Sequence, residues 1–339
     1  MDSDPTMAPP VVVCAQCGQP AGNKCAKCGY AHFCSRECQV AGWPSHKLTC
    51  SAKVAVKAVS GAGMGLFARQ SFAVGECLVQ EKPIFMVSAS SYSAARTQAE
   101  AMAIVDAQVR ELIPQLPKAR HAAVMGLSDA TFPEAVTPLG IWRTNGMPCG
   151  DDSGLFALAC RINHSCRPNV RWCWRADLGT QHIFAMRPIE EGEELLAAYS
   201  KTYARRADRV ARLQAQFHFT CACPLCSGPE AGSFDEEMCE IQANIDALPA
   251  ACQTDMKRAL ALSERNLSLL AAIGLDTPIA MGTAHYEAFQ LARATAQPDK
   301  AKLHLRRAWE LSIHSEGADS PKTAQYAGLL AAEGLPSGH

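Results

Sequence analysis

The sequence predicts an α+β fold that begins with a small zinc-bound segment, continues as a core of short strands and ends in helices. Three observations favour this class. Seven of the 17 cysteines fall between Cys14 and Cys50. Alternating apolar residues and glycine turns, typical of short strands, follow over residues 54–87 and return over 155–199. From Phe234 to Leu330 the apolar spacing is helical.

The composition bounds the kind of protein. Of the 339 residues, 48% are hydrophobic and 19% are charged, which allows a sizeable core and excludes a wholly disordered chain. Lys and Arg number 32 against 33 Asp and Glu, a net charge of -1, so bulk electrostatics does not favour a nucleic acid as partner. No apolar run approaches the ~18 residues that a membrane span needs, and we expect no membrane partner.

The chain divides by composition into five regions. The N-terminus lacks the basic start and apolar run of a signal peptide, and we expect it to be a loose tail. A change to Ala, Gln, Glu and Arg marks a helical insert inside the strand-rich region. The expected regions are a flexible tail (1–13), a zinc segment (14–50), a strand-rich domain (54–200, with the insert at about 90–139), a second cysteine segment (201–228) and a helical region (232–339).

The zinc segment carries eight potential ligands at the spacing C-x2-C-x7-C-x2-C-x5-C-x3-C-x7-H-x3-C. They are Cys14, Cys17, Cys25, Cys28, Cys34, Cys38, His46 and Cys50. Eight ligands complete two tetrahedral sites and leave no position for water, which is typical of structural zinc. The segment has few large apolar side chains, so the metal must supply its folding free energy.

The second cysteine segment is incomplete by itself. Cys221, Cys223 and Cys226 give three ligands, and a tetrahedral site requires a fourth, for which Cys166 is the obvious candidate. Zinc at this place would join the loop that contains Cys166 to the segment after Tyr199. We therefore expect one pocket to be surrounded by Asn163, His164, Tyr199 and Phe219.

The zinc segment resembles the MYND finger in the order of its aromatic and cysteine residues, from His32 to Cys38 and from Trp43 to His46. The resemblance implies interleaved pairs. One zinc would be held by Cys14, Cys17, Cys34 and Cys38, and the other by Cys25, Cys28, His46 and Cys50. It also implies a protein-interaction module that binds proline-containing peptides. Its charged residues are only mildly basic, which does not favour DNA.

Three further motifs resemble the SET domain of protein lysine methyltransferases, and the whole chain resembles the SET-and-MYND family. They are the turn Gly63-Met64-Gly65, the run Asn163-His164-Ser165-Cys166-Arg167-Pro168-Asn169 and the Cys221–Cys226 tail. The resemblance implies S-adenosylmethionine as cofactor. Gly63, Gly65 and Asn145 would hold its amino-acid end, Asn163 and His164 its ribose and adenine side, and Phe219 would stack on adenine. Tyr199 takes the place of the catalytic tyrosine and lines the lysine channel with Phe217.

The implied function is methyl transfer to lysine side chains of histone or non-histone proteins, with three zinc ions and the finger as interaction module. The alternative is a weak or inactive adaptor that recruits proline-rich partners in transcriptional regulation. It is motivated by Phe217, where the family often has Tyr, and by Gly146, where many relatives carry a small polar residue. Abundant thiols indicate a reducing compartment, and we expect a monomer of the cytoplasm and nucleus.

Two sets of residues receive no specific role from the sequence. The basic run after Tyr199 is interpreted as a solvated helix face, with attraction of an acidic substrate as the alternative. Its members are Lys201, Arg205, Arg206, Arg209 and Arg212. The six remaining cysteines are interpreted as buried small hydrophobic residues. They are Cys77, Cys149, Cys160, Cys173, Cys239 and Cys252.

Overall fold

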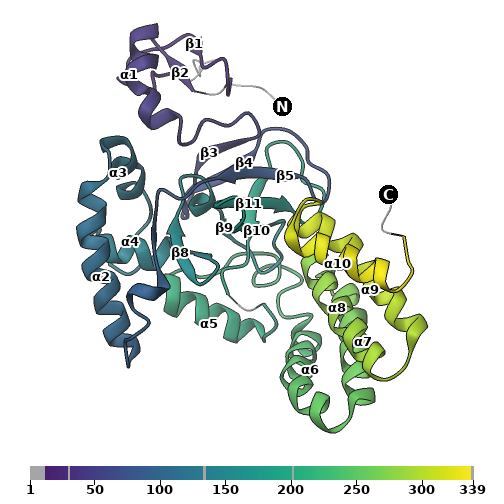
Figure 1. The fold of residues 1–339 in the computed structure, drawn as a ribbon. Helices are drawn as coiled ribbons and strands as arrows, with labels where there is room; N and C mark the ends of the chain where they lie inside the picture. The colour runs from purple at the N-terminus through teal and green to yellow at the C-terminus, as the bar shows by residue number, and fades with distance from the viewer. Residues whose placement is uncertain (1–11, 30, 133–134, 201, 337–339) are drawn as a thin grey trace.

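The computed structural model describes residues 12–336 with gaps at 30, 133–134 and 201. Most of the expected tail, residues 1–13, therefore lies outside the described residues, as does Lys201 of the basic run. Within the described part the fold is α+β, as the sequence predicts. The zinc segment stands at one end, the strands fill the middle, and two groups of helices flank them (Figure 1).

The N-terminal segment is a short hairpin followed by a helix. Strand β1 (Asn23–Lys24) pairs antiparallel with β2 (His32–Phe33), and helix α1 (Arg36–His46) follows directly. The Ser35 side chain caps α1 by accepting a hydrogen bond from the Cys38 N–H, which fixes the turn between two cysteines. Arg69 donates to the carbonyls of Cys28 and Ser51, so the segment is anchored to the strand domain.

The middle of the molecule consists of three small sheets around one apolar core, which includes Leu66, Phe156 and Ile183. The first has the order β3 (Val54–Val59), β4 (Gly63–Ala68), β12 (Glu194–Ala197), β9 (Asn163–His164). The second has the order β10 (Val170–Arg175), β11 (Thr180–Ala185), β5 (Cys77–Glu81). The third has the order β6 (Phe85–Val87), β8 (Asp152–Leu155), β7 (Met147–Cys149).

One pairing matters most for function. Strands β12 and β9 are parallel, with Leu196 opposite Asn163 and Ala197 opposite His164. The buried Asn169 side chain fixes this crossing, because its amide donates to the Glu194 carbonyl and its oxygen accepts from the Leu196 N–H. Two stretches far apart in the sequence are thereby held side by side.

The insert and the C-terminal region supply the helices. The expected insert contains α2 (Gln98–Gln115) and α3 (Lys118–Met125), while α4 (Pro138–Asn145) begins at its end and runs beyond it. After the strands come α5 (Arg206–Phe217), α6 (Asp235–Thr254), α7 (Met256–Ala272), α8 (Pro278–Ala294), α9 (Pro298–Glu316) and α10 (Pro321–Ala332). No helix of the described part is long and apolar enough to cross a membrane.

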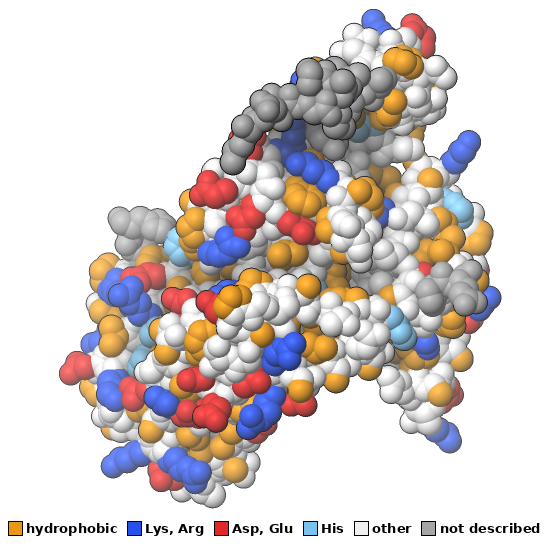
Figure 2. All heavy atoms as spheres, turned by 180° about the vertical axis from the view of Figure 1, so that it is seen from behind, with side chains coloured by type: hydrophobic (Ala, Val, Ile, Leu, Met, Phe, Trp, Pro, Cys, Tyr) orange, Lys and Arg blue, Asp and Glu red, His pale blue; other side chains and the backbone are white. Residues whose placement is uncertain are grey.

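Charged contacts attach the C-terminal helices to the strands. Glu316, at the end of α9, accepts a hydrogen bond of 2.7 Å from the Cys173 thiol and lies 3.0 Å from an Arg171 nitrogen. Arg175 of β10 reaches Asp319 at 3.0 Å. Over the helical region, the face seen in Figure 2 mixes charges of both signs, in keeping with the balanced composition.

Two interpretations of the sequence are wrong in part. Arg209 does not belong to a solvated face: it is 1% exposed and donates to the Leu225 carbonyl at 2.9 Å. Among the six leftover cysteines, Cys149 and Cys173 are buried, but the other four are half-buried (Cys77, Cys160, Cys239 and Cys252). Apolar periodicity does not reveal these outcomes, because both depend on segments that pack from elsewhere in the chain.

Candidate active site

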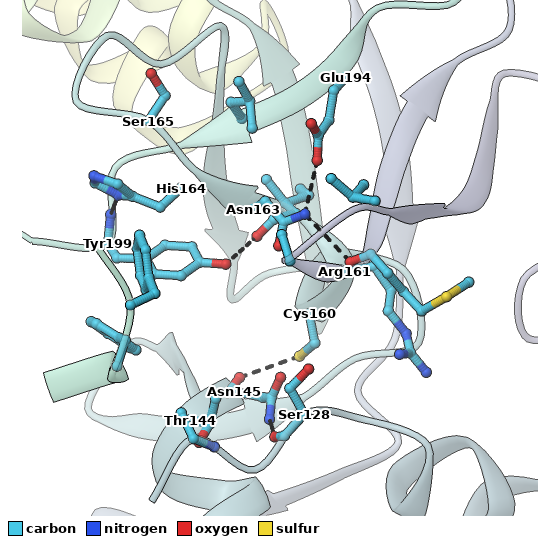
Figure 3. Close-up of a pocket in the computed structure, with 18 of the residues that line it drawn as sticks. Ser128, Thr144, Asn145, Cys160, Arg161, Asn163, His164, Ser165, Glu194 and Tyr199 are labelled. Carbon is cyan, nitrogen blue, oxygen red and sulfur yellow. Dashed lines mark hydrogen bonds between the residues drawn. The ribbon is translucent and has the colours of Figure 1, made fainter. Parts of the chain in front are cut away.

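A cavity of about 1170 Å³ lies where the strands, helix α4 and the segment after β12 meet (Figure 3). Most of the residues expected at a cofactor or lysine site border it, namely Asn145, Asn163, His164, Tyr199, Phe217 and Phe219. The expected pocket is thus formed. At the glycine turn, the residues that border the cavity are Gly61, Ala62 and Met64.

Gly63 and Gly65 are not among the described residues that border the cavity, and each has a structural role in the turn. Gly63 has φ +74°, a backbone conformation that is unfavourable for residues with a Cβ atom. At Gly65 a Cβ would fall 2.5 Å from a Glu194 oxygen and 2.7 Å from the Val59 side chain. Gly65 is therefore required so that β4 can approach Glu194 closely, which places that carboxylate at the cavity wall.

Tyr199 is fixed at both ends. Its hydroxyl donates a 2.6 Å hydrogen bond to the Ile162 carbonyl, and its N–H donates to His164 Nδ1 at 3.0 Å. The Phe217 ring lies 5.0 Å away, centroid to centroid. Burial raises the pKa of Tyr199, so the phenol is neutral. Because the hydroxyl proton is engaged with Ile162, the oxygen can accept a hydrogen bond from a ligand in the cavity.

His164 connects this pocket to a cysteine cluster. Burial lowers the pKa of His164 to about 4, so the imidazole is neutral. Since Nδ1 accepts from Tyr199, the proton is assigned to Nε2, which lies 3.4 Å from Cys166 Sγ. The Phe219 ring lies 6.0 Å from the imidazole, centroid to centroid, and presents an apolar surface to the cavity.

The expected fourth zinc ligand is in place. Cys166, Cys221, Cys223 and Cys226 are all buried or nearly so, and their sulfurs lie within 4.8 Å of one another. Cys166 Sγ and Cys226 Sγ are 3.6 Å apart. Tetrahedral zinc with bonds of about 2.3 Å requires sulfur separations of roughly 3.8 Å, so the geometry fits the metal.

The N-terminal ligands also form the two interleaved groups that the resemblance implies. One group is Cys14, Cys17, Cys34 and Cys38, and the other is Cys25, Cys28, His46 and Cys50, each within the same 4.8 Å limit. Separations of 3.6 Å between Cys17 and Cys34 sulfurs, and 4.0 Å between Cys25 and Cys50 sulfurs, match the edges of a tetrahedral site.

Several polar residues that border the cavity received no role from the sequence, among them Glu194, Arg161 and Ser128. Glu194 accepts a 2.8 Å hydrogen bond from Asn163 Nδ2, and Arg161 and Ser128 also border the cavity. Arg161 and Glu194 stand inside or beside the motifs already recognised, which is the signal that could have identified them. Ser128 lies outside every recognised motif. Its carbonyl accepts from Asn145 Nδ2 at 2.7 Å.

The Glu81 carboxylate fixes a stretch of backbone that forms part of the cavity wall. Glu81 accepts hydrogen bonds from the N–H groups of Ala157, Leu158 and Ala159, the last at 2.6 Å. Burial raises the pKa of Glu81 to about 7. These bonds fix the start of the 3-10 helix Ala159–Arg161, whose three residues all border the cavity and which leads into Ile162.

Comparison with known proteins agrees with this geometry. The SET domain model matches residues 63–200, and the MYND finger model matches residues 14–50. Histone-lysine N-methyltransferase set5 of Schizosaccharomyces pombe is 30% identical over 170 residues, which cover 50% of this chain and 48% of that protein. N-lysine methyltransferase SMYD2 of Gallus gallus is 27% identical over 253 residues, which cover 69% of this chain and 53% of that protein.

The chain spans about half the length of these curated relatives. Among solved structures, Rubisco LSMT bound to AdoMet covers 86% of this chain at 10% identity with a TM-score of 0.36, a likeness too low to support a functional conclusion. The two domain matches are more specific, because each coincides with a cluster of ligands or cavity residues described above. The chain thus carries a MYND finger followed by a SET domain, which is the domain combination that the resemblance in the sequence implies.

Proposed function

We propose that this protein transfers a methyl group from S-adenosylmethionine to the side-chain amine of lysine in a protein substrate. One observation carries the proposal. The hydroxyl of Tyr199, the Asn163–His164 strand and the ring of Phe219 border a single cavity, and a cluster of four buried cysteines closes the chain around it.

The residues present fit this cofactor. The cavity of about 1170 Å³ is slightly larger than the roughly 300–1,000 Å³ of common ligand pockets, which leaves room for a lysine side chain beside the cofactor. Phe219 offers a flat apolar surface for a purine, and the polar end around Asn145 and Arg161 suits a charged amino-acid group. When bound, S-adenosylmethionine supplies an electrophilic methyl group on sulfur.

The protein's own contribution is positioning, together with exclusion of water. A free lysine amine has a pKa of about 10.4 and is charged. The rings of Tyr199 and Phe217, 5.0 Å apart, form an apolar wall that disfavours the ammonium form and so lowers the pKa of an inserted amine. The Tyr199 oxygen, fixed by Ile162, then accepts a hydrogen bond from the neutral amine and orients its lone pair.

Tyr199→Phe tests this role directly. We expect methyl transfer to fall by about 100-fold or more, because the amine loses its orienting acceptor. Cofactor affinity, measured by calorimetry, should stay within about threefold. Tyr203→Phe is the matched control, since Tyr203 is another largely buried tyrosine and is not among the described cavity residues. Histones and cell lysate with labelled cofactor supply the substrates.

The proposal is rejected if the wild-type protein labels no protein in these mixtures and also shows no cofactor binding. An unchanged transfer rate in Tyr199→Phe would reject the role of the hydroxyl. These two results are distinguishable, because the first concerns the wild-type chain and the second only one side chain.

A second function, recruitment of a proline-containing peptide by the finger, has its own observation. Apolar side chains are exposed on this small domain, with Val40 at 66% and Trp43 at 39%. We propose that these exposed apolar side chains form the surface that binds the peptide. We also propose that the protein is located in the cytoplasm and nucleus. If the protein is solely an adaptor, Cys25→Ser abolishes its effect on transcriptional regulation while Tyr199→Phe leaves that effect unchanged. The reverse pattern would reject the adaptor hypothesis.

A further inference from the structure

Two arginines border the cavity, and they differ in their surroundings. Arg143, near the end of α4, is exposed. Arg161 ends the 3-10 helix that precedes Asn163, is half-buried, and donates from Nη1 to the Gly126 carbonyl at 2.7 Å. Figure 3 shows Arg161 among the residues that surround the cavity.

The contacts of Arg161 locate it at one end of the cavity. The second guanidinium nitrogen, Nη2, lies 3.5 Å from the point where a Cβ on Gly126 would stand. Two residues further on, the Ser128 carbonyl accepts from Asn145 Nδ2 at 2.7 Å. The Ser128 hydroxyl lies 3.7 Å from the corresponding Cβ position of Gly63. Arg161 therefore lies on the side of the cavity that Ser128 and Asn145 border, near the turn that contains Gly63.

The charge of Arg161 has no carboxylate partner among the described residues. Arg171, Arg175 and Arg209 each lie within 4.0 Å of a carboxylate oxygen, whereas Arg161 forms no such ion pair in the described part of the chain. Burial lowers the pKa of Arg161, which reflects the cost of keeping this cation out of water. An anion bound at this end of the cavity would reduce that cost.

The carboxylate of Glu194, which also borders the cavity, does not serve as the anionic partner of Arg161. Glu194 is engaged by Asn163 Nδ2 at 2.8 Å, on the side of β12. A guanidinium can bind a carboxylate through two parallel N–H donors, which gives both charge and orientation. A cofactor with a free carboxylate at its amino-acid end would supply the anionic partner that Arg161 does not have among the described residues.

We propose that Arg161 binds the carboxylate of the cofactor's amino-acid end and thereby sets the direction in which the cofactor lies in the cavity. This inference rests on the proposed function. It adds a residue that the motif resemblance does not provide, since the glycine turn carries Ala62 and Met64 beside its glycines and no cation.

The test compares two ligands by calorimetry, S-adenosylmethionine and its decarboxylated analogue, which retains the sulfonium and the amine. In Arg161→Gln we expect affinity for S-adenosylmethionine to fall by about 10- to 100-fold, because a charge-assisted pair is lost. Affinity for the decarboxylated analogue should change by less than about threefold. Arg205→Gln is the matched control and should leave both affinities nearly unchanged, because that side chain is exposed and is not among the described residues that border the cavity.

Three results would overturn the inference alone. In the first, Arg161→Gln lowers the affinity for both ligands equally, which indicates a structural role through Gly126. In the second, Arg161→Gln lowers neither affinity. In the third, the wild-type protein binds the two ligands with equal affinity. If the wild-type protein binds neither ligand, both this inference and the proposed function fail. The decarboxylated analogue also reports folding, because its unchanged affinity in the variant shows an intact cavity.

Discussion

The finger and the third cysteine cluster (Cys166, Cys221, Cys223 and Cys226) both rely on cysteine ligands, but they use them in different ways. All eight ligands of the finger lie within residues 14–50, and three of the four in one group are exposed or half-buried. In the third cluster, Cys166 and Cys226 lie 60 residues apart, and their sulfurs are buried and only 3.6 Å from each other. Zinc bound in the finger would therefore fold one local segment, whereas zinc bound in the third cluster would join two distant segments.

This difference has a functional consequence. The third cluster holds the Asn163–His164 strand next to the segment that carries Phe217 and Phe219, and all four residues border the cavity. The finger contacts the strand domain through Arg69 and lies at the far end of the molecule in Figure 1. The two kinds of site should therefore respond differently to the loss of one ligand.

The largest expected effect comes from Cys223→Ser. Loss of one of four thiolates should release the zinc and unfold the segment after Tyr199, so cofactor affinity falls below detection although Cys223 holds no substrate. Cys25→Ser is the matched change in the finger and should leave cofactor affinity within about threefold. Zinc content and calorimetry measure both. Normal cofactor affinity in Cys223→Ser would remove the functional distinction between the two regions.

An intermediate effect is expected at Arg209, which lies beside the third cluster. Four thiolates around a divalent zinc carry net negative charge, and the buried guanidinium offers Nη2 at 3.9 Å from Cys226 Sγ. In Arg209→Met the carbonyls of Ala204 and Leu225 also lose their donor. We expect a loss of about 2–4 kcal/mol of stability and faster release of one zinc to a chelator.

Arg205→Met is the control for this change, because Arg205 is exposed at the start of α5 and should alter stability by less than about 0.5 kcal/mol. Thermal unfolding and the rate of zinc release are the measurements. If both variants behave alike, the cluster does not depend on a buried cation, and the two zinc regions differ less than the structure indicates.

The smallest expected effect concerns the C-terminal helices, a region that has no zinc ligand among its described residues. His285 of α8 faces His304 and Arg307 of α9, with Glu264 of α7 and Lys300 beyond His304. Burial, followed by the nearby His304 and Arg307, lowers the pKa of His285 to about 4. A histidine whose pKa is depressed on folding stabilises the fold above its unfolded pKa of about 6.5, and this contribution is lost as pH falls towards 4.

His285→Gln should remove that dependence. Between pH 7 and pH 5 we expect the wild type to lose of the order of 1 kcal/mol more than the variant, since His285 is only partly buried and solvent screens its charge. Helix unfolding followed by circular dichroism at each pH measures the difference. Equal pH dependence in the two proteins would show that His285 does not couple the helices to pH.

The sequence predicted more of the zinc chemistry than of the polar surroundings of the cavity. Spacing predicted the finger ligands, and counting ligands led to Cys166, because tetrahedral coordination requires four donors. Local periodicity likewise predicted helices beyond Phe234. It could not show that Asp255 would separate α6 from α7, since no glycine or proline marks that break.

Ligand spacing, glycine turns and helical periodicity could be predicted from the sequence, because they depend only on neighbours along the chain. Tertiary structure alone decided that Arg209 is buried against the third cluster, that Gly65 makes room for Glu194, and that Arg161 faces the cavity. The physical reason is the parallel crossing of β12 and β9. It brings together segments about 30 residues apart, and only the final packing determines which polar group each side chain meets.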